Sequence, residues 1–328
     1  MRLLVRPDPE AASSYVADYI VDRINAFAPS AERPFVLGLP TGSSPLLIYR
    51  FLVAAYTAGR VSFRHVVTFN MDEYVALPRD HPQSYHSFMF AHLFRHIDIP
   101  ADHVHILDGN PPGGDYAGEC ARYEAAIRAV GGIELFLGGV GSDGHIAFNE
   151  PGSSLASRTR IKSLAPETRR ANARFFGGGD ADVDAVPRMA LTVGVATVLD
   201  AREVVVIATG ARKALAVQQA VEGGVSHMCT LSSLQLHPRS LVVVDDEATV
   251  ECKVKTINYF RGVEQTVQRA SQPGLPRAVQ TPPRLDTAVA AMAAENGELT
   301  PDSMSSRIGS PKMLAVRSAT IPFALMRQ

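Results

Sequence analysis

The sequence predicts an α/β protein with a doubly wound, mainly parallel, Rossmann-like sheet flanked by helices. Short apolar runs of strand type alternate with longer segments in which apolar residues recur at helical spacing. Several of these runs end in turns rich in glycine, serine or acidic residues, at the edge where open α/β sheets bind their ligands. With 328 residues and 46% hydrophobic content, the chain can bury a full core.

The composition argues against several other classes of protein. The formal net charge is −1, so no global basic field attracts nucleic acid or an anionic membrane. No apolar run approaches the ~20 residues of a membrane span, and the N-terminus lacks the pattern of a signal peptide. The three cysteines are scattered without metal-ligand spacing. We therefore expect a cytoplasmic protein with reduced thiols and with neither nucleic acid nor membrane as a partner.

The first part of the chain predicts a helix over residues 10–27, a buried strand over 35–39 and a second helix from 46 to about 58. Between this strand and the second helix lies a polar turn, whose candidate ligand-binding members are Thr41, Gly42, Ser43 and Ser44. Free N–H groups and hydroxyls at the positive end of a helix dipole form an anion cradle, although an ordinary capped helix start explains the turn equally well. This turn carries neither the GxxxxGK[ST] motif nor the GxGxxG motif, which argues against ATP and NAD as its ligands.

The second predicted strand, residues 65–69, leads directly into acidic residues. Asp72 and Glu73 follow it at the end where an open α/β sheet places its ligand. Asp72 is therefore a candidate general base, and either carboxylate can instead serve as a loop or helix cap.

Four histidines then follow within a short stretch. Two of them, His92 and His96, have the i, i+4 spacing that some zinc-binding helices use, and the others are His81 and His86. No glutamate adjoins the pair as it does in HExxH, so we expect a solvated helix face rather than a metal site.

The strongest functional signal lies in the loop after the central strand. An amphipathic helix predicted over 115–130 leads to an apolar run at 135–137, which ends in a glycine-rich turn. Asp143, His145 and Glu150 lie within eight positions of one another there. Glycines permit close approach to a ligand, and histidine, with an unperturbed pKa of about 6.5, carries protons near neutrality. Flanking carboxylates can fix its tautomer and raise its basicity, so this loop is the predicted active site.

The segment over about residues 155–190 predicts a lid. It is rich in serine, arginine and glycine, has few strand signals, and is long for a connection. Its positive charge suits a phosphorylated substrate, while a solvated basic loop accounts equally for most of its arginines. The basic residues are Arg158, Arg160, Lys162, Arg169, Arg170 and Arg174.

Residues 191–195 and 204–208 supply further predicted strands. The second ends in a Thr-Gly-Ala-Arg-Lys turn at a helix start. Lys213 in this turn therefore repeats the anion-binding geometry predicted for the first polar turn.

The last predicted strand spans 241–244, and a helix over 248–260 closes a single domain at residues 1–264. The remainder, 265–328, is expected to be a disordered tail, apart from a short helix near 287–295. Its stretch from residue 266 onward holds seven of the 22 prolines and a single aromatic residue.

Several sequence blocks resemble those of the glucosamine-6-phosphate deaminase (isomerising) family. They occur in the family's order over about residues 1–262: LGLPTGSSP, SFRHVVTFNMDEYVALPRDHPQSYHSFM, GSDGHIAFNEPGSSLASRTRIK, NARFF, ALTVGVATVLDAREV, GARKALA and ECKVKT. The resemblance implies an enzyme of amino-sugar catabolism. Its reaction would be the aldose–ketose isomerising deamination of D-glucosamine 6-phosphate to D-fructose 6-phosphate and ammonia. Such a deaminase, a hydrolase and isomerase in one, requires no cofactor and no metal.

The resemblance also implies individual roles. Asp72, in the TFNMDEY block, is the base that moves a proton between C2 and C1 of the sugar. His145, in the GHIAFNEP block, opens the pyranose ring, and Asp143 and Glu150 complete its proton relay. The phosphate-binding residues are Thr41, Gly42, Ser43, Ser44, Arg174 and Lys213. The chemistry agrees, because ring opening needs an acid/base, isomerisation needs a carboxylate over C2, and the remote phosphate supplies orientation.

Some hexameric members of that family are activated by N-acetylglucosamine 6-phosphate at a subunit interface. The resemblance therefore implies a homo-oligomer, expected to be a hexamer, and makes retained activation a hypothesis. The matching positions are Ser153, Ser154, Arg160, Lys162 and Tyr259. There are three departures from the family pattern: Ser142 stands where Asn or Pro is common, Cys229 replaces a usual Trp, and the long tail has no counterpart.

Two rival interpretations stand beside this one. Another sugar-phosphate enzyme of related fold, such as a 6-phosphogluconolactonase or a pentose-phosphate isomerase, lacks the combined TFNMDEY and GHIAFNEP blocks. A sugar-phosphate sensor that binds without turnover is expected to lose Asp72 or His145, and both residues are present.

Overall fold

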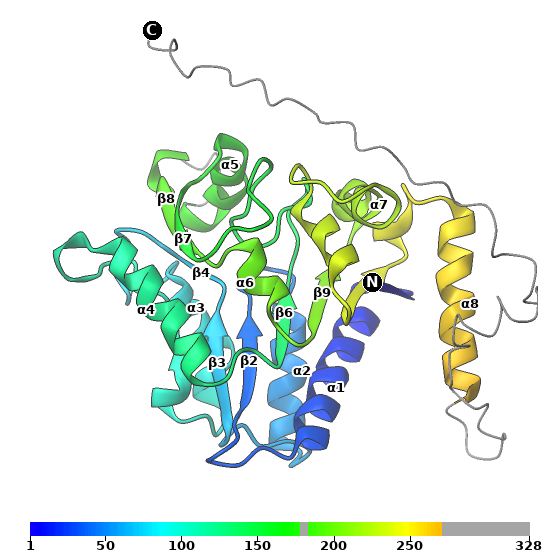
Figure 1. Ribbon diagram of the computed structural model, residues 1–328, viewed down its shortest axis with the longest axis horizontal. Helices are drawn as coiled ribbons and strands as arrows, with labels where there is room; N and C mark the ends of the chain where they lie inside the picture. The colour runs from blue at the N-terminus through cyan, green and yellow to red at the C-terminus, as the bar shows by residue number, and fades with distance from the viewer. Residues whose placement is uncertain (178–182, 271–328) are drawn as a thin grey trace, which may run out of the picture. The chain divides into compact units, whose positions relative to one another are not determined.

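The computed structural model describes residues 1–177 and 183–270, and its centre is a seven-stranded sheet (Figure 1). In order across the sheet, the strands are β1 (Arg2–Arg6), β10 (Ser240–Asp245), β9 (Val204–Ala208), β6 (Leu135–Gly138), β2 (Phe35–Leu39), β3 (Val66–Asn70) and β5 (Val104–His105). Every pair of neighbours in this sheet is parallel. The predicted doubly wound, mainly parallel sheet is confirmed.

The central strands are apolar on both faces because helices cover both faces. In β2, Leu37 packs into a layer with the helices α1 (Pro9–Phe27) and α2 (Leu46–Thr57). Its neighbour Val36 faces the opposite layer, which includes residues of α4 (Tyr116–Ala129) and α7 (Ala214–Glu222). This alternation follows from the period of two along a strand.

The strand order predicts where a ligand binds at the carboxyl end of the sheet. From β2 the chain passes to β3 on one side, whereas β6 lies on the other side of β2. Adjacent connections therefore leave in opposite directions between β2 and β6, which is the switch point where open α/β sheets bind ligands. The polar turn that starts at Thr41 and the loop that carries His145 both begin there.

A second, three-stranded antiparallel sheet lies beside the first and was not predicted. Its strands, in order, are β4 (Asp72–Tyr74), β8 (Met189–Thr192) and β7 (Arg160–Ser163). The helix α5 (Pro166–Phe176) lies between β7 and β8 in the chain, so the expected lid segment holds regular structure. Strand β7 escaped prediction because its sequence, RIKS, carries a single aliphatic residue.

Two predicted element boundaries were wrong. The strand expected over 191–195 ends at Thr192, and the short helix α6 (Val195–Leu199) begins where the strand was expected to continue. The closing helix expected over 248–260 is α8 (Val254–Ala270), which extends past residue 264 into the expected tail. Glu264 on α8 forms an ion pair with Arg6 of β1, with 2.8 Å between the charged atoms. Residues 271–328, including the helix expected near 287–295, lie outside the described residues.

The histidine pair does not share a helix. Helix α3 (Tyr85–His92) ends at His92, and His96 lies in a separate 3₁₀ turn, where both side chains are exposed. Among residues 1–177 and 183–270, no group of three or more His, Cys, Asp or Glu side chains is placed to hold a metal ion. In the same two ranges, no helix combines the length and the apolar character that crossing a membrane requires.

Candidate active site

A cavity of about 660 Å³ opens at the carboxyl ends of β2, β3 and β6. Its walls include every residue to which the sequence analysis gave a catalytic or phosphate-binding role. These are Asp72, Asp143, His145 and Glu150 for catalysis, and Thr41, Gly42, Ser43, Ser44, Arg174 and Lys213 for the phosphate. Five separate stretches of the chain therefore contribute to one space.

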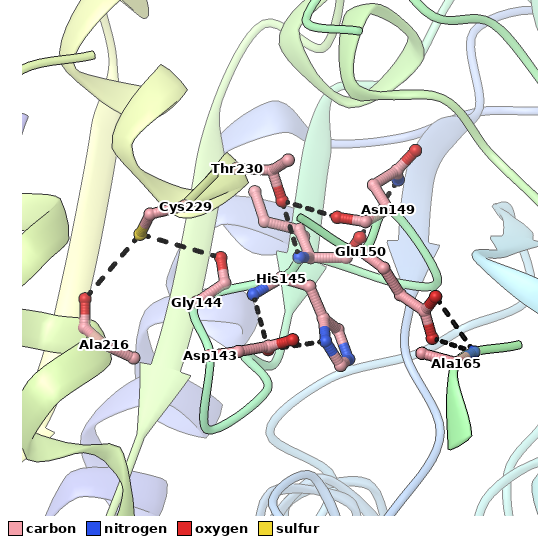
Figure 2. Close-up of polar contacts among 10 residues, drawn as sticks. Asp143, Gly144, His145, Asn149, Glu150, Ala165, Ala216, Cys229 and Thr230 are labelled. Carbon is pink, nitrogen blue, oxygen red and sulfur yellow. Dashed lines mark hydrogen bonds and ion pairs between the residues drawn. The ribbon is translucent and has the colours of Figure 1, made fainter. Parts of the chain in front are cut away.

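The imidazole of His145 is held against Asp143 by the loop that follows β6 (Figure 2). Its Nδ1 lies 2.7 Å from Oδ1 of Asp143, and the main-chain N–H of His145 donates to the same oxygen at 3.2 Å. Gly141 permits this packing, because a Cβ there would lie only 2.4 Å from Cε1 of the imidazole. With Nδ1 facing the carboxylate, Nε2 is the ring nitrogen left for a substrate.

The contact between these two side chains also sets the charge of Asp143. Burial acts to raise the pKa of Asp143, but hydrogen bonding and the charge of His145 outweigh burial and hold that pKa below its ordinary value. Asp143 is therefore ionised at neutral pH and can stabilise a protonated imidazole beside it.

Asp72 is the first residue of β4 and lies almost fully buried in the cavity wall, with 6% of its surface exposed. Its Oδ1 has no hydrogen-bond partner within the described part of the chain. Burial, and then the nearby charge of Glu73, raise the pKa of Asp72 well above its ordinary value. A carboxylate in this state is a stronger base than one in water, which suits proton abstraction.

The neighbouring carboxylate has a structural role instead. Glu73 accepts the main-chain N–H groups of Tyr74, Tyr85 and His86 at 2.8, 3.0 and 2.9 Å. Two of these donors belong to the first turn of α3, so Glu73 helps the N-cap residue Ser84 to cap this helix and holds Tyr85 in the cavity wall. The sequence left open which carboxylate is the cap; the structure assigns the cap to Glu73 and leaves Asp72 in the cavity.

Glu150 lies in the same cavity, but its carboxylate is directed at the lid segment (Figure 2). Both carboxylate oxygens accept the main-chain N–H of Ala165, the residue that precedes α5, at 2.9 and 3.0 Å. Of the two carboxylates expected in the relay, Asp143 makes the direct contact with His145. Glu150 thus ties the active-site loop to the start of α5.

The opposite part of the cavity wall is suited to an anion. After Pro45, α2 begins without any side chain capping its N-terminus, and Gly42, at φ +108°, has open space around its Cβ position. Unpaired N–H groups at a helix start bind phosphate well. Burial lowers the pKa of Lys213, and the positive charge of Arg174 acts in the same direction, so the two cations lie within electrostatic reach of each other.

Sequence reasoning missed the aromatic wall of the cavity and one supporting carboxylate. The wall consists of Tyr74, Tyr85, Phe88, Phe148, Phe175 and Phe176. The signal was present, because each of these residues lies inside a block that already carried the resemblance. Asp245, fully buried at the end of β10, accepts the N–H of Gly210 at 2.9 and 3.0 Å and so fixes the turn that carries Lys213. No local pattern indicates that pairing.

The five positions matched to an effector site do not line the cavity. Arg160 and Lys162 lie on β7, whereas Tyr259 lies on α8, at the other side of the molecule in Figure 1, and is exposed. Arg160 donates to Oδ1 of Asn149 at 2.9 Å. The remaining two, Ser153 and Ser154, are respectively buried and exposed.

Comparison with known proteins identifies the family of this chain. Residues 7–250 match the model of the family described as glucosamine-6-phosphate isomerases/6-phosphogluconolactonase. The chain belongs to this family. A glucosamine-6-phosphate deaminase of Pectobacterium carotovorum subsp. carotovorum (strain PC1) is 60% identical over 264 residues, which make up 80% of this chain and 97% of that relative.

Two solved structures share the fold of this chain. A monomeric glucosamine-6-phosphate deaminase superposes with a TM-score of 0.72 at 36% identity, over 76% of this chain and 100% of its own. A 6-phosphogluconolactonase from Trypanosoma cruzi gives a TM-score of 0.61 at 20% identity, over 77% of this chain and 97% of its own. The second likeness shows the shared fold alone.

Proposed function

We propose that the chain converts D-glucosamine 6-phosphate and water into D-fructose 6-phosphate and ammonia, as an isomerising deaminase. One observation carries this proposal: the buried Asp72, the His145–Asp143 pair and a phosphate-binding end line one cavity. Relatives named glucosamine-6-phosphate deaminase, at about 60% identity over nearly their whole length, support it.

His145 opens the sugar ring in the proposed reaction. Nε2 takes the proton of the O1 hydroxyl and returns a proton to O5, so the C1–O5 bond breaks and an open-chain aldehyde forms. The ionised Asp143 stabilises the imidazolium that exists between these two transfers.

Asp72 then carries the isomerisation. Its ionised carboxylate takes the proton from C2, the C2–H electron pair forms a C1–C2 double bond, and O1 takes up the proton that the substrate's ammonium group releases, which gives an enolamine. The same carboxylic acid then delivers its proton to C1. The resulting C2 iminium adds water and loses ammonia, which leaves the C2 ketone. Burial helps, because it raises the basicity of the carboxylate toward a weakly acidic carbon.

The sugar phosphate is held at the other end by the turn at Thr41, by Arg174 and by Lys213. These groups touch no reacting atom, but they place C2 over Asp72. Such orientation can supply several kcal/mol of barrier lowering. Because the protein as a whole has almost no net charge, the phosphate has to be bound by cations within the cavity itself.

The decisive experiment measures ammonia and fructose 6-phosphate released by purified protein, beside the variants Asp72→Asn and His145→Gln. We expect equal molar release of both products and a loss of at least ~100-fold in kcat for each variant. Tight binding of the sugar phosphate without release, or hydrolysis of 6-phosphogluconolactone in its place, would overturn the proposal.

We also propose that the chain assembles into a homohexamer and that N-acetylglucosamine 6-phosphate activates it. Each chain would form one domain over residues 1–264, in which the segment 155–190 acts as a lid. The exposed apolar side chains of Leu215, Met228 and Leu236 support assembly, and the buried hydroxyl of Ser153, without a hydrogen-bond partner in the described ranges, supports a ligand nearby. Light scattering gives the mass, and saturation curves with and without the N-acetyl sugar test activation. A monomer with unchanged curves contradicts both.

A cytoplasmic location completes the proposal. All three cysteines are free thiols, and two of them are buried, which suits a reducing compartment. Fractionation of the native cells, with detection of the protein in the cytosolic or membrane fraction, tests this directly.

A further inference from the structure

The main chain between His145 and Glu150 forms a tight turn that is held from outside the loop. The N–H of Asn149 donates to the carbonyl of Ile146 at 3.0 Å, and Ala147 between them has φ +52°. That left-handed conformation is unfavourable for a residue with a Cβ atom, so the turn needs further contacts to persist.

Thr230 supplies two of these contacts through a single hydroxyl (Figure 2). It is the first residue of a 3₁₀ helix, Thr230–Leu236, and its side chain is fully buried. Oγ1 accepts the N–H of Ile146 at 3.1 Å and lies 3.0 Å from the carbonyl oxygen of Asn149, to which it donates. A hydroxyl has one proton to donate, so this pairing fixes its rotation.

The two main-chain groups that Thr230 contacts belong to the peptide units next to His145 and Glu150. The N–H of Ile146 lies in the peptide unit that follows His145, and the carbonyl of Asn149 lies in the unit that precedes Glu150. Peptide units are planar, so fixing one restricts the direction of the adjoining Cα–Cβ bond. One hydroxyl therefore sets the two side chains relative to each other.

The residue after Thr230 completes the arrangement. The N–H of Leu231 donates to the carbonyl of Gly144 at 2.9 Å, and that carbonyl belongs to the peptide unit before His145. The 3₁₀ helix start thus holds both peptide units that flank the histidine. Thr230 itself does not line the cavity, so it acts on the reaction through other residues.

We propose that Thr230 is a positioning residue for the deamination, whose hydroxyl fixes His145 and Glu150 relative to each other. The inference rests on the proposed function. The phosphate-binding groups come from other elements, namely the turn after β2, α5 and the turn after β9. Loss of the hydroxyl therefore lowers kcat and leaves KM for the sugar phosphate nearly unchanged, because the Glu150 carboxylate that holds Ala165 at the start of α5 is kept.

The test compares Thr230→Val, which keeps the shape and removes the hydroxyl, with Thr230→Ser, which keeps the hydroxyl. The matched control is Ser233→Ala, which removes another buried hydroxyl of the same 3₁₀ helix. Ser233 is buried, and the hydrogen bond that its hydroxyl donates goes to the carbonyl of Thr230, at 2.7 Å, rather than to the active-site loop. We expect kcat to fall about tenfold or more in the Val variant, with KM within about twofold of wild type. The Ser variant and the control should stay within about threefold of wild-type kcat.

Thermal unfolding of all three variants separates positioning from stability. If the Val variant loses stability as the Ala control does but keeps wild-type kcat, the hydroxyl is merely structural and the proposal is wrong. If the Ser variant is as slow as the Val variant, the methyl group matters rather than the hydroxyl, which also overturns it.

A second readout does not depend on turnover. The ring signals of His145, identified in ¹H–¹⁵N spectra by their loss in His145→Gln, should move in the Val variant and return in the Ser variant. If the wild-type protein releases no ammonia, the proposed function is wrong. The spectra still test whether Thr230 positions His145, because they do not require turnover. Unchanged spectra in the Val variant contradict the positioning role.

Discussion

Glu150, in the loop after β6, accepts the main-chain N–H of Ala165 with both carboxylate oxygens, at 2.9 and 3.0 Å. This pairing connects the loop that carries His145 to α5, the helix that carries Arg174. The loop that carries His145 and the start of α5 are therefore coupled through one carboxylate.

The first prediction concerns that coupling. Glu150→Gln keeps one acceptor oxygen and loses the charge, and Glu150→Ala loses both, so α5 becomes progressively less well anchored. We expect KM for the sugar phosphate to rise in the order wild type, Gln, Ala, by about tenfold in Ala, because α5 carries Arg174, one of the proposed phosphate-binding residues. Steady-state kinetics measure this. A fall in kcat with constant KM in both variants would show a pure relay role.

The second prediction concerns Asp72 and stability. Folding raises the pKa of Asp72, so the folded state holds the proton of this side chain more tightly than the unfolded state does. The free energy of unfolding therefore falls as the pH rises above about 3.8, the pKa of Asp72 in the unfolded chain. Each unit of raised pKa corresponds to about 1.4 kcal/mol. Asp72→Asn should therefore be inactive and yet more stable than wild type at pH 7.

Thermal unfolding between pH 3.5 and 8 measures the effect of that substitution. The difference in melting temperature should shrink toward the acid end, where Asp72 is protonated in both states. A variant that is less stable than wild type at pH 7 contradicts the assignment of Asp72 as a buried, unpaired base.

The third prediction concerns the packing of Gly144 on Cys229 (Figure 2). Gly144 has φ +86°, and a Cβ there would lie 2.4 Å from Sγ of Cys229. Gly144→Ala therefore meets both backbone strain and a clash, and we expect kcat to fall about 100-fold. Cys229→Ala removes the clash alone, so the double variant should recover part of the loss.

A double-mutant cycle on kcat and on the free energy of unfolding tests the pair of substitutions. The single variant Cys229→Ala should retain most activity, which makes it the control. Strict additivity of the two single effects would show that the sulfur contact contributes nothing to the loop.

The fourth prediction concerns the charge of Lys213. Burial lowers the pKa of this lysine below its ordinary value of 10.5, so its charge is lost at a lower pH than in a free lysine. Binding of fructose 6-phosphate, in the absence of ammonia, should weaken as the pH rises from 7 to 9.5. Lys213→Arg should bind with little pH dependence over that range, because arginine stays charged.

Calorimetric titration of the same ligand into Lys213→Met provides the comparison. This variant should bind weakly throughout, by about tenfold or more at pH 7. Equal affinities for wild type and the Met variant, with the same pH dependence, would remove Lys213 from the phosphate site.

The sequence predicted the buried parts of the fold well. The strands over 35–39 and 204–208 have the same bounds in the structure, because each is a continuous apolar run buried on both faces. The short strands β4, β5 and β7 were missed, since two to four residues with few aliphatic side chains give no readable period.

The sequence indicated the candidate proton-transfer residues that line the cavity, but it did not indicate the residues that hold them in place. Asp72 and His145 lie in local motifs whose chemistry is visible in the sequence. Glu73 as a helix cap, Asp245 behind Gly210 and Thr230 behind the active-site loop all act through main-chain groups that are distant in sequence. Every residue has main-chain N–H and C=O groups, so the sequence does not indicate which of them a given side chain will bind.

The pairing of β4 with β8 divides the reaction machinery between two sheets. Asp72 and Arg174 belong to the small antiparallel sheet and its helix, whereas His145 and Lys213 follow strands of the large parallel sheet. In the proposed reaction, each sheet thus contributes one proton-transfer group and one phosphate-binding cation. For protein engineering, the stretch from β7 to β8 is therefore a unit that can be exchanged between relatives. Its exchange replaces Arg174, the proposed phosphate-binding arginine, and leaves His145, the proposed ring-opening histidine, untouched.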